Sequence, residues 1–363
     1  MKKQPDYLLF LVVILLVGIG VSMIFSASSN IAFKKFGDES YFLKRQIFGS
    51  ITAIAVLIIM SYVNSSMLMK IAPALLIISF ILCVIVFIPG IGIKLSNVYR
   101  WINFRLFLFQ PSELAKIAVV VNLAVILHKK KDKIENFFTG VAYPLLIVIL
   151  FFLLVVLQPD FTTAIFIILV SVFMLFIAGT PARHLAILGG IGVPIIAILT
   201  SIAGYRLKRI WAFISSDSDS LGAGFQILES LKAFDRGGFL GVGIGKGYKT
   251  LPEPFTDFIF SVYGEEAGFL GCALVILLFA IFTYRGIRIA SRCQDSFLSL
   301  LAYGLTAMIS LQAIVNFMSS LGLIPTTGIT LPFLSYGRSS LIISCAVAGI
   351  LLNISKKTQV EAE

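Results

Sequence analysis

Charged residues are scarce in this chain of 363 residues. Asp, Glu, Lys and Arg together make up 13% of the sequence, whereas hydrophobic residues make up 58%. Soluble globular domains carry about 25% charged residues. The composition therefore excludes a soluble protein and predicts an integral membrane protein without a separate soluble domain.

Histidine is rarer still, which limits the catalytic chemistry that the chain can perform. The two histidines, His128 and His184, each lie at the end of a predicted span, on the side assigned below to the cytoplasm. This excludes a Ser-His-Asp or Cys-His arrangement on the outer face, and no His or Cys cluster has the spacing of metal ligands. Catalysis on the outer face would have to use carboxylates, and we predict no metal site.

Cysteine is too scarce and too scattered for a disulfide framework. Cys83, Cys272 and Cys345 lie in apolar runs, and Cys293 lies in an arginine-rich loop. We interpret all four as packing residues.

Long apolar runs are what the sequence has in abundance. A bilayer crossing requires about 20 mostly apolar residues, and such runs recur along the whole chain. We predict an all-α integral membrane protein with about ten transmembrane helices, forming a single domain over residues 1–363. Gln158-Pro159-Asp160 is expected to be a tight turn between two spans, because proline does not continue a helix. The predicted spans are residues 7–28, 46–64, 70–89, 112–128, 139–157, 161–178, 185–203, 257–284, 296–321 and 338–354.

Lys and Arg in the short loops predict the orientation of these spans. The basic groups at 129–133 and 285–292 fall on the same side of the membrane as Lys2 and Lys3. Both termini are therefore expected in the cytoplasm. The stretch 204–256 is expected to be a large extracellular loop between the seventh and eighth helices.

The expected outer face is basic. It contains Arg100, Arg206, Arg209 and Lys249, among other cations, around the acidic Asp257. Guanidinium and ammonium groups recognise phosphate, so this face indicates an anionic ligand. The alternative is that these cations are scattered surface charges and headgroup anchors.

The outer loop also contains the glycine-rich segment GGFLGVGIGKG at residues 237–247. It matches neither a Walker A loop nor a dinucleotide fingerprint. Alternating glycines allow a chain to point backbone N–H groups at an anion. The alternative is a flexible, tightly turning external loop.

Two charged residues fall inside the fourth predicted helix. Glu113 and Lys116 are three residues apart on one face, where they can form an ion pair. Burying such a pair contributes little stability, so we predict a functional or site-organising role. Gln110-Pro111-Ser112 just before them indicates the start of the helix.

Three acids belong to the eighth predicted span, where an ionised carboxylate costs about 2.5 kcal/mol or more and indicates function. Asp257 lies at the start of this helix, as either a base facing an external cleft or a helix cap. Glu265 and Glu266 lie further in. At least one of them is expected to pair with a cation on another helix, with Lys116 and Arg338 as candidates.

The segment LPEPFTDFIFSVYGEEAGFLG at residues 251–271 is the most specific of seven stretches that carry a family resemblance. In the same order along the chain, these stretches resemble the SEDS family (shape, elongation, division and sporulation), the multi-span FtsW and RodA proteins of bacteria. The similarity covers nearly the whole chain and is closest to the FtsW division branch. The other stretches are YRWINF (99–104), FQPSELAK (109–116), LQPDFTTA (157–164), YRLKR (205–209), GFQILESLKAFDRGG (224–238) and TGITLPFLSYGRSSL (327–341).

The resemblance implies a glycosyltransferase that polymerises lipid II into β-1,4-linked peptidoglycan strands on the outer face of the bacterial cytoplasmic membrane. The family has ten spans, and its essential aspartate, in the TDF motif, falls on Asp257. That carboxylate would accept the proton of the acceptor sugar's 4-hydroxyl as undecaprenyl pyrophosphate leaves. The implied substrate-binding residues are Arg100, Arg209 and Lys249 for the pyrophosphate, Gln226 and Ser339 as polar lining, and Glu113 and Lys116 as the charged pair that shapes the cavity.

The chain departs from the family pattern at three positions near these residues. Phe255 stands where histidine is usual, Arg338 where glycine is usual, and Thr162 where glycine is common. The base itself is retained. Arg338 is expected to neutralise one of the deep acids.

The resemblance also implies partners: a class B penicillin-binding protein and other division proteins, besides lipid II and membrane lipids, and no nucleic acid. No cofactor is evident, although a divalent cation bridging the pyrophosphate and a carboxylate would leave little sequence motif. Two alternatives stay open: a lipid II transporter (flippase) and a membrane scaffold for a division transpeptidase. Against transport, the two halves show no internal repeat, and the candidate site lies at the outer interface rather than the midplane.

Overall fold

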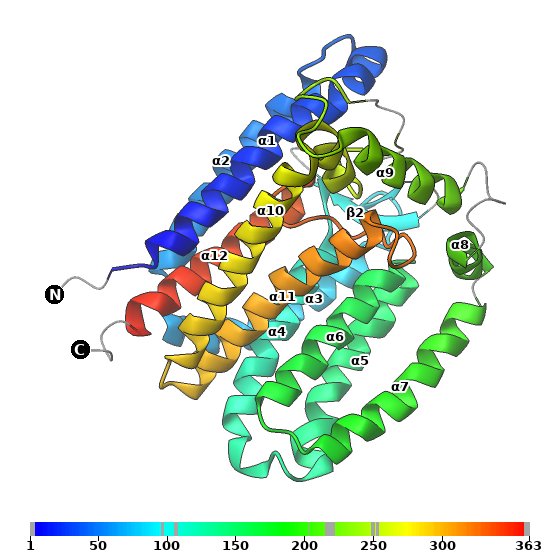
Figure 1. The fold of residues 1–363 in the computed structure, drawn as a ribbon. Helices are drawn as coiled ribbons and strands as arrows, with labels where there is room; N and C mark the ends of the chain where they lie inside the picture. The colour runs from blue at the N-terminus through cyan, green and yellow to red at the C-terminus, as the bar shows by residue number, and fades with distance from the viewer. Residues whose placement is uncertain are drawn as a thin grey trace.

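The computed structural model is a bundle of long helices with a small sheet and two shorter helices at one end (Figure 1). It describes residues 4–95, 98–104, 108–202, 204–214, 222–247, 251 and 254–358. The first and last described residues lie on the same side of the molecule (Figure 1). The assignment of both termini to the cytoplasm stays a prediction.

In chain order the elements are α1 (Tyr7–Phe36), α2 (Tyr41–Tyr62), α3 (Ser65–Ile85), β1 (Gly92–Leu95), β2 (Val98–Asn103), β3 (Leu108–Phe109), α4 (Pro111–Lys129), the 3₁₀ turn η1 (Lys131–Lys133), the π-helical turn η2 (Phe137–Ala142), α5 (Tyr143–Leu157), α6 (Phe161–Ile177), α7 (Ala182–Ile202), α8 (Gly204–Ile214), α9 (Ala223–Gly237), α10 (Ile259–Ser291), α11 (Ser296–Ser320) and α12 (Arg338–Thr358). Most elements follow one another with short connections, and longer ones precede α10 and α12.

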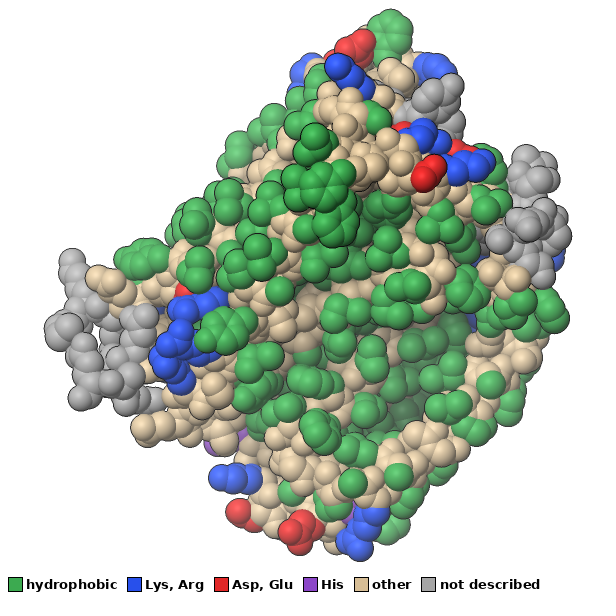
Figure 2. Space-filling model, viewed as in Figure 1, with side chains coloured by type: hydrophobic (Ala, Val, Ile, Leu, Met, Phe, Trp, Pro, Cys, Tyr) green, Lys and Arg blue, Asp and Glu red, His purple; other side chains and the backbone are tan. Residues whose placement is uncertain are grey.

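The helices confirm the prediction of a helical, multi-pass membrane protein. Within the described residues, nine helices are long and apolar enough to cross a membrane: α1, α2, α3, α4, η2 continued by α5, α7, α10, α11 and α12. The remaining predicted span corresponds to α6, whose 17 residues make about 25 Å of helix. Hydrophobic side chains cover much of the long helices, whereas charged ones gather near the ends (Figure 2). The count of ten spans therefore depends on α6.

The all-α prediction misses a small sheet between α3 and α4. Its strands lie in the order β1-β2-β3 and pair antiparallel. β2 reads VYRWIN, and valine, tyrosine, tryptophan and isoleucine favour strands. The sheet places Arg100 and Trp101 beside the candidate site described below.

The core of the bundle lies around α4. This helix packs against α3, α5, α6, α11 and α12, and it is buried along most of its length, as is α12. In contrast, α7 is apolar but almost unburied, because it lies at the edge of the bundle (Figure 1). An apolar helix without a buried face is suited to contact with lipid. Glu113 and Lys116 of α4 are therefore enclosed by protein rather than exposed to lipid.

The stretch predicted as a large extracellular loop contains two helices. Both α8 and α9 have a strongly amphipathic sequence, which is typical of helices that lie in a membrane interface. α9 packs along α10. The stretch is therefore at least partly a folded layer over the end of the bundle.

The eighth predicted span is not one continuous helix. α10 is interrupted at Gly268, whose backbone angles are φ 65° and ψ −164°. Only glycine adopts this region readily. A residue with these angles cannot continue the helical hydrogen-bond ladder, so polar backbone groups on both sides of the kink need other partners.

The glycine-rich segment 237–247 supplies these partners. The carbonyl oxygens of Glu265 and Glu266 accept hydrogen bonds from the N–H groups of Val242 and Gly243, both at 3.0 Å. On the far side of the kink, the N–H of Phe269 donates to the carbonyl oxygen of Gly238 and that of Leu270 to Phe239, at 2.9 and 3.3 Å. In this structure the segment forms hydrogen bonds with α10 on both sides of the kink. This role is neither the anion-binding loop nor the flexible external loop considered from the sequence.

Replacement of Gly268 by alanine should destabilise the protein. A Cβ atom at this position would lie 2.3 Å from the backbone nitrogen of Gly241, and the backbone conformation itself costs a non-glycine residue about 1–3 kcal/mol. We expect Gly268→Ala to lower the thermal unfolding midpoint of the detergent-purified protein by several degrees. Gly190→Ala in α7 is the matched control, since a Cβ atom there has nothing within 4 Å. Equal midpoints for the two variants would show that close contact between the segment 237–247 and α10 is dispensable for stability.

Candidate functional site

Two adjoining cavities lie at the end of the bundle that carries the sheet, α8 and α9. The polar lobe, of about 270 Å³, lies between α4, α11 and the segment 328–340. The basic lobe, of about 390 Å³, lies between α6, α8 and the segment 324–328. The residues that line both lobes are Arg100, Asp160, Asp257 and Gly328. Asp257 therefore lies where the two lobes meet.

The backbone of Asp257 is held from two sides. Asn316 of α11 donates to its carbonyl oxygen at 2.9 Å, and the Ser335 hydroxyl donates to the carbonyl oxygen of Thr256 at 2.6 Å. The N-cap of α10 is Phe258, so Asp257 lies one residue before the cap position. The carboxylate is partly exposed at the junction, in a place suited to contact with a bound molecule.

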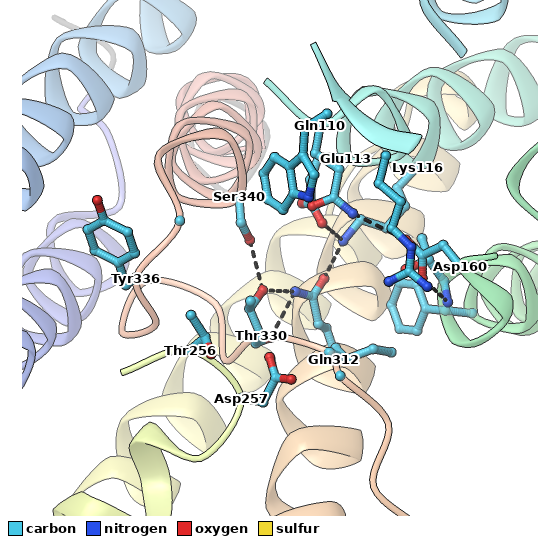
Figure 3. A pocket seen from close by; sticks show the side chains of 17 residues that line it. Gln110, Glu113, Lys116, Asp160, Thr256, Asp257, Gln312, Thr330, Tyr336 and Ser340 are labelled. Carbon is cyan, nitrogen blue, oxygen red and sulfur yellow. Dashed lines mark hydrogen bonds and ion pairs between the residues drawn. The ribbon is translucent and has the colours of Figure 1, made fainter. Parts of the chain in front are cut away.

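A chain of hydrogen bonds runs along the wall of the polar lobe (Figure 3). The predicted ion pair forms, with Lys116 Nζ 2.9 Å from Glu113 Oε1. Lys116 Nζ also donates to Gln312 Oε1 at 2.8 Å, and Gln312 Nε2 donates to the Thr330 carbonyl at 3.0 Å. The Thr330 and Ser340 hydroxyls are 3.1 Å apart. These contacts join α4, α11, the segment 328–340 and α12 into one wall.

Asp160 is a site residue that the sequence analysis did not single out. Its Oδ1 accepts from the N–H of Thr163 and caps α6, and its Oδ2 accepts from Gln110 Nε2 at 3.1 Å and from Ser112 Oγ at 3.4 Å. The signal was present in LQPDFTTA, but the tripeptide at 158–160 was interpreted only as a turn. The turn brings this carboxylate to the start of α4 and so into both lobes.

Two predicted pyrophosphate ligands lie at the cavities. Arg209 lines the basic lobe, and its Nη1 donates to the Thr326 carbonyl at 3.2 Å. Arg100 lines both lobes, with Nε donating to the Gln158 carbonyl at 3.0 Å and Nη2 donating to the Pro159 carbonyl. Arg100 thus also ties the sheet to the end of α5, while both guanidinium groups bring positive charge to the junction.

Three other residues considered from the sequence are placed differently from one another. Arg206 lines the basic lobe, with its guanidinium carbon 4.0 Å from the ring centre of Phe161. Gln226, on α9, is not among the described residues that line either lobe. Lys249 lies outside the described residues.

Ser339 is structural in this geometry rather than part of the lining. It is 3% exposed, and its hydroxyl donates to the Leu108 carbonyl at 3.0 Å and accepts from the Gln110 N–H at 3.2 Å. These bonds join the start of α12 to β3 and α4. The next residue, Ser340, lines the polar lobe instead. The motif predicted the right region, but the helix turns the second serine toward the cavity.

The deep acids of α10 have partners other than the cations predicted for them. Glu265 pairs with Arg236 of α9, with 2.6 Å between Oε1 and Nε. Glu266 accepts a hydrogen bond from the hydroxyl of Ser26 in α1. Arg338 instead packs its aliphatic stem against α2 at Gly49, where a Cβ atom would lie 2.8 Å from Arg338 Cγ. The expectation that at least one of these acids pairs with a cation on another helix is confirmed by Glu265 and Arg236. The candidate cations Lys116 and Arg338 were the wrong choice for Glu265, because α9 packs along α10 and places Arg236 beside this acid.

Phe255, the residue that departs from the usual histidine, belongs to an aromatic cluster. Its ring centre lies 4.9 Å from that of Phe42 and 5.6 Å from that of Tyr336, and its carbonyl oxygen accepts from the Tyr336 N–H at 2.8 Å. Burial raises the pKa of the Tyr336 phenol, so this ring stays neutral beside the polar lobe. The cluster anchors the chain just before Thr256 and Asp257.

In the described part of the chain, no three His, Cys, Asp or Glu side chains come together as metal ligands. A divalent cation at the junction would have to take most of its ligands from substrate and water. The bridging cation considered from the sequence stays an open alternative.

The chain is similar to known proteins along almost its whole length. A family model described as cell cycle protein, covering FtsW, RodA and SpoVE, matches residues 6–360. A probable peptidoglycan glycosyltransferase FtsW of Trichlorobacter lovleyi is 42% identical over 356 residues, which is 97% of this chain and 93% of the relative. Stage V sporulation protein E of Bacillus subtilis is 42% identical over 359 residues, which is 98% of both chains.

Solved structures show the same fold. One chain, from work on the structural coordination of polymerization and crosslinking by a peptidoglycan synthase complex, superposes with a TM-score of 0.82 at 25% identity, covering 98% of both chains. The rod shape determining protein RodA of Thermus thermophilus superposes with a TM-score of 0.73 at 26% identity, covering 97% of both chains.

Removal of one member of the ion pair in α4 should be far more harmful than removal of both. The side chains of Lys116 and Glu113 are 5% and 9% exposed, so Lys116→Met leaves a buried carboxylate without its cation, at a cost of about 3–5 kcal/mol. We expect the Glu113→Gln/Lys116→Met double variant to recover most of the lost stability. Thermal unfolding of the wild type, Glu113→Gln, Lys116→Met and the double variant measures the coupling energy between the two side chains. Additive losses in the double variant would contradict a buried, mutually compensating pair.

Proposed function

This chain belongs to the FtsW, RodA and SpoVE family of cell cycle proteins, and we infer that it is a peptidoglycan glycosyltransferase. We propose that it polymerises lipid II into β-1,4-linked glycan strands at the cavities around Asp257. The observation that carries this proposal is the position of Asp257 at the junction of a basic lobe and a polar lobe. A transferase that joins two sugars needs a base between the place of the leaving group and the place of the acceptor.

Asp257 is the proposed general base. Its carboxylate accepts the proton of the acceptor's N-acetylglucosamine 4-hydroxyl, and that oxygen attacks the anomeric carbon of the donor's N-acetylmuramic acid. The bond to undecaprenyl pyrophosphate breaks, and the configuration inverts to a β-1,4 link. General base assistance contributes typically 10²–10⁴-fold. The bonds from Asn316 and Ser335 hold the turn that carries this base.

The basic lobe is the proposed place of the pyrophosphate. Arg206 and Arg209 line it from α8, and Arg100 lies at its junction with the polar lobe. As the glycosidic bond breaks, negative charge grows on the leaving pyrophosphate. Fixed positive charge stabilises that transition state more than the ground state. The amphipathic sequence of α8 suits a position near the membrane surface, where a lipid-linked pyrophosphate is found.

The polar lobe is the proposed place of the acceptor sugar. Its wall offers amide, hydroxyl and paired charged groups, among them Gln110, Gln312, Thr330 and Ser340. Such groups match sugar hydroxyls in hydrogen bonding without adding net charge. Asp160 faces the same lobe while it is held by Gln110 and Ser112, so it can accept a bond from a substrate hydroxyl.

The proposed setting is the bacterial cytoplasmic membrane, with both termini in the cytoplasm and the cavities on the outer face. The basic clusters at the end with the termini support this orientation. A class B penicillin-binding protein is the proposed partner. The similar chain from a peptidoglycan synthase complex described as coordinating polymerization and crosslinking supports such a partner.

Substitution of the base should abolish polymerisation without unfolding the protein. With labelled lipid II and the cognate class B penicillin-binding protein, we expect Asp257→Asn and Asp257→Ala to lower the initial rate by at least about 100-fold. Asp295→Asn is the matched control, because Asp295 caps α11 through bonds to Phe297 and Leu298, and asparagine caps equally well. Gel analysis of glycan length measures the product.

The same preparation separates transfer from transport. Wild-type activity lost in both well-folded Asp257 variants supports the transferase and places the base. If the wild type with its partner makes no polymer but moves lipid II across vesicle membranes, the transport function replaces the proposal. Polymer made by Asp257→Ala at the wild-type rate would show that another group acts as the base.

The planar guanidinium geometry of Arg209 should contribute to the polymerisation rate in addition to its positive charge. We expect Arg209→Gln to lower the polymerisation rate by about 100-fold, through loss of one positive donor near the leaving group. Arg209→Lys should recover only part of the rate, because an ammonium lacks the planar fork of guanidinium. Arg183→Gln is the control, because it makes the same change of charge in the first turn of α7, whereas α8 follows the last turn of α7. Equal rates for Arg209→Gln and Arg183→Gln would remove Arg209 from the site.

A further inference from the structure

A second polar cleft lies at the opposite end of α10, beside the start of α1 and the end of α12. The first residues of α1, the last turns of α10 and the last turns of α12 form it. Its polar lining residues are Asp6, Arg285, Arg288, Arg292, Ser355 and Thr358. This cleft shares no residue with the two lobes around Asp257.

The frame of the cleft is tightly bonded. Asp6 is 4% exposed and caps α1 by accepting from the N–H of Leu9 at 3.0 Å. Its second carboxylate oxygen accepts from Arg285, at 2.7 Å from Nε and 2.5 Å from Nη2. The Asp6 N–H donates to Ser355 Oγ at 3.0 Å. Asp6 therefore links three helices, because its carboxylate contacts α1 and α10 and its backbone N–H contacts α12.

The carboxylate of Asp6 neutralises the charge of one of the three arginines that line the cleft. Arg285, Arg288 and Arg292 follow one another at spacings of three and four residues, on one face of α10. In the part of the chain that the structure describes, Asp6 is the acidic residue that lines the cleft, and it is engaged with Arg285. Arg288 and Arg292 add two positive charges to the same recess. Figure 2 shows Lys and Arg side chains gathered at this end of the molecule.

The surroundings indicate where the matching anion comes from. Beside the cleft, the adjoining helix turns expose Leu8, Tyr284 and Ile287. Exposed apolar side chains next to a basic recess suit a molecule with a charged head and an apolar tail. Tyrosine is enriched at membrane interfaces, and basic pockets between transmembrane helices bind acidic lipid headgroups.

We propose that this cleft binds the phosphate of an acidic phospholipid headgroup. Arg288 and Arg292 contact the phosphate by charge-assisted hydrogen bonds, while Arg285 remains bound to Asp6. The acyl chains lie against the apolar turns of α1 and α10. A bound lipid then adds a contact between the three helices at the end of α10 remote from Asp257.

The test uses the full-length protein in detergent with defined lipids. We expect dioleoyl phosphatidylglycerol, but not dioleoyl phosphatidylcholine, to raise the thermal unfolding midpoint and to be retained in native mass spectra. In Arg288→Gln/Arg292→Gln, retention of phosphatidylglycerol should fall at least threefold. Lys129→Gln/Lys133→Gln is the matched control, since it removes the same charge at the last residue of α4 and in η1, and it should retain lipid as the wild type does.

The outcomes separate the two sources of phosphate. Retention lost in the arginine variant and kept in the lysine variant supports the lipid site. Equal stabilisation by inorganic phosphate at the same concentration would overturn the lipid and assign a free anion. Equal retention by the arginine variant and the wild type, or equal loss in both double variants, would overturn the cleft as the site. None of these measurements uses glycan synthesis, so they stand apart from the proposed function.

Discussion

The ion pair between Glu113 and Lys116 is the interaction on which the site depends. It lies in α4, which five other helices surround, and neither charge would be tolerated there without the other. Because Lys116 also donates to Gln312, the pair fixes α11 and the segment 328–340 relative to α4. Those two elements in turn hold the turn at Asp257. A charge pair of small net stability thus determines where the proposed base lies.

The kink in α10 likewise leaves buried polar groups, here of the backbone, that need partners from another segment. A helix broken at Gly268 loses the bonds from residues 269 and 270 to residues 265 and 266. The segment 237–247 supplies hydrogen-bond partners on both sides of the break, because its carbonyl and N–H groups take the place of the missing helical partners. Backbone groups within a membrane protein must be satisfied internally. The glycines are therefore needed for close approach of two backbones, and the layer formed by α9 is locked onto α10.

The distribution of charge follows from these two constraints. Among the acids near the end that carries the cavities, Glu265 is paired with Arg236, and Asp160 serves as a helix cap and hydrogen-bond acceptor. Asp257 differs in its position, since it lies at the meeting point of two cavities of different polarity. Arg206 and Arg209 of α8 line one cavity, whereas amide, hydroxyl and paired charged groups line the other, and this difference is the basis for the proposed places of the two substrates.

Much of this protein can be predicted from local sequence. Apolar runs predicted the positions of the helices, the three-residue spacing predicted the pair in α4, and the motif around Asp257 predicted the family. These features depend on residues near one another in the chain. The tertiary structure alone decided that Asp160 joins the site, that Ser340 rather than Ser339 lines it, and that α9 supplies the cation for Glu265. Each of these depends on which distant segments meet and on the face that each helix turns inward, and neither follows from the order of residues within one segment.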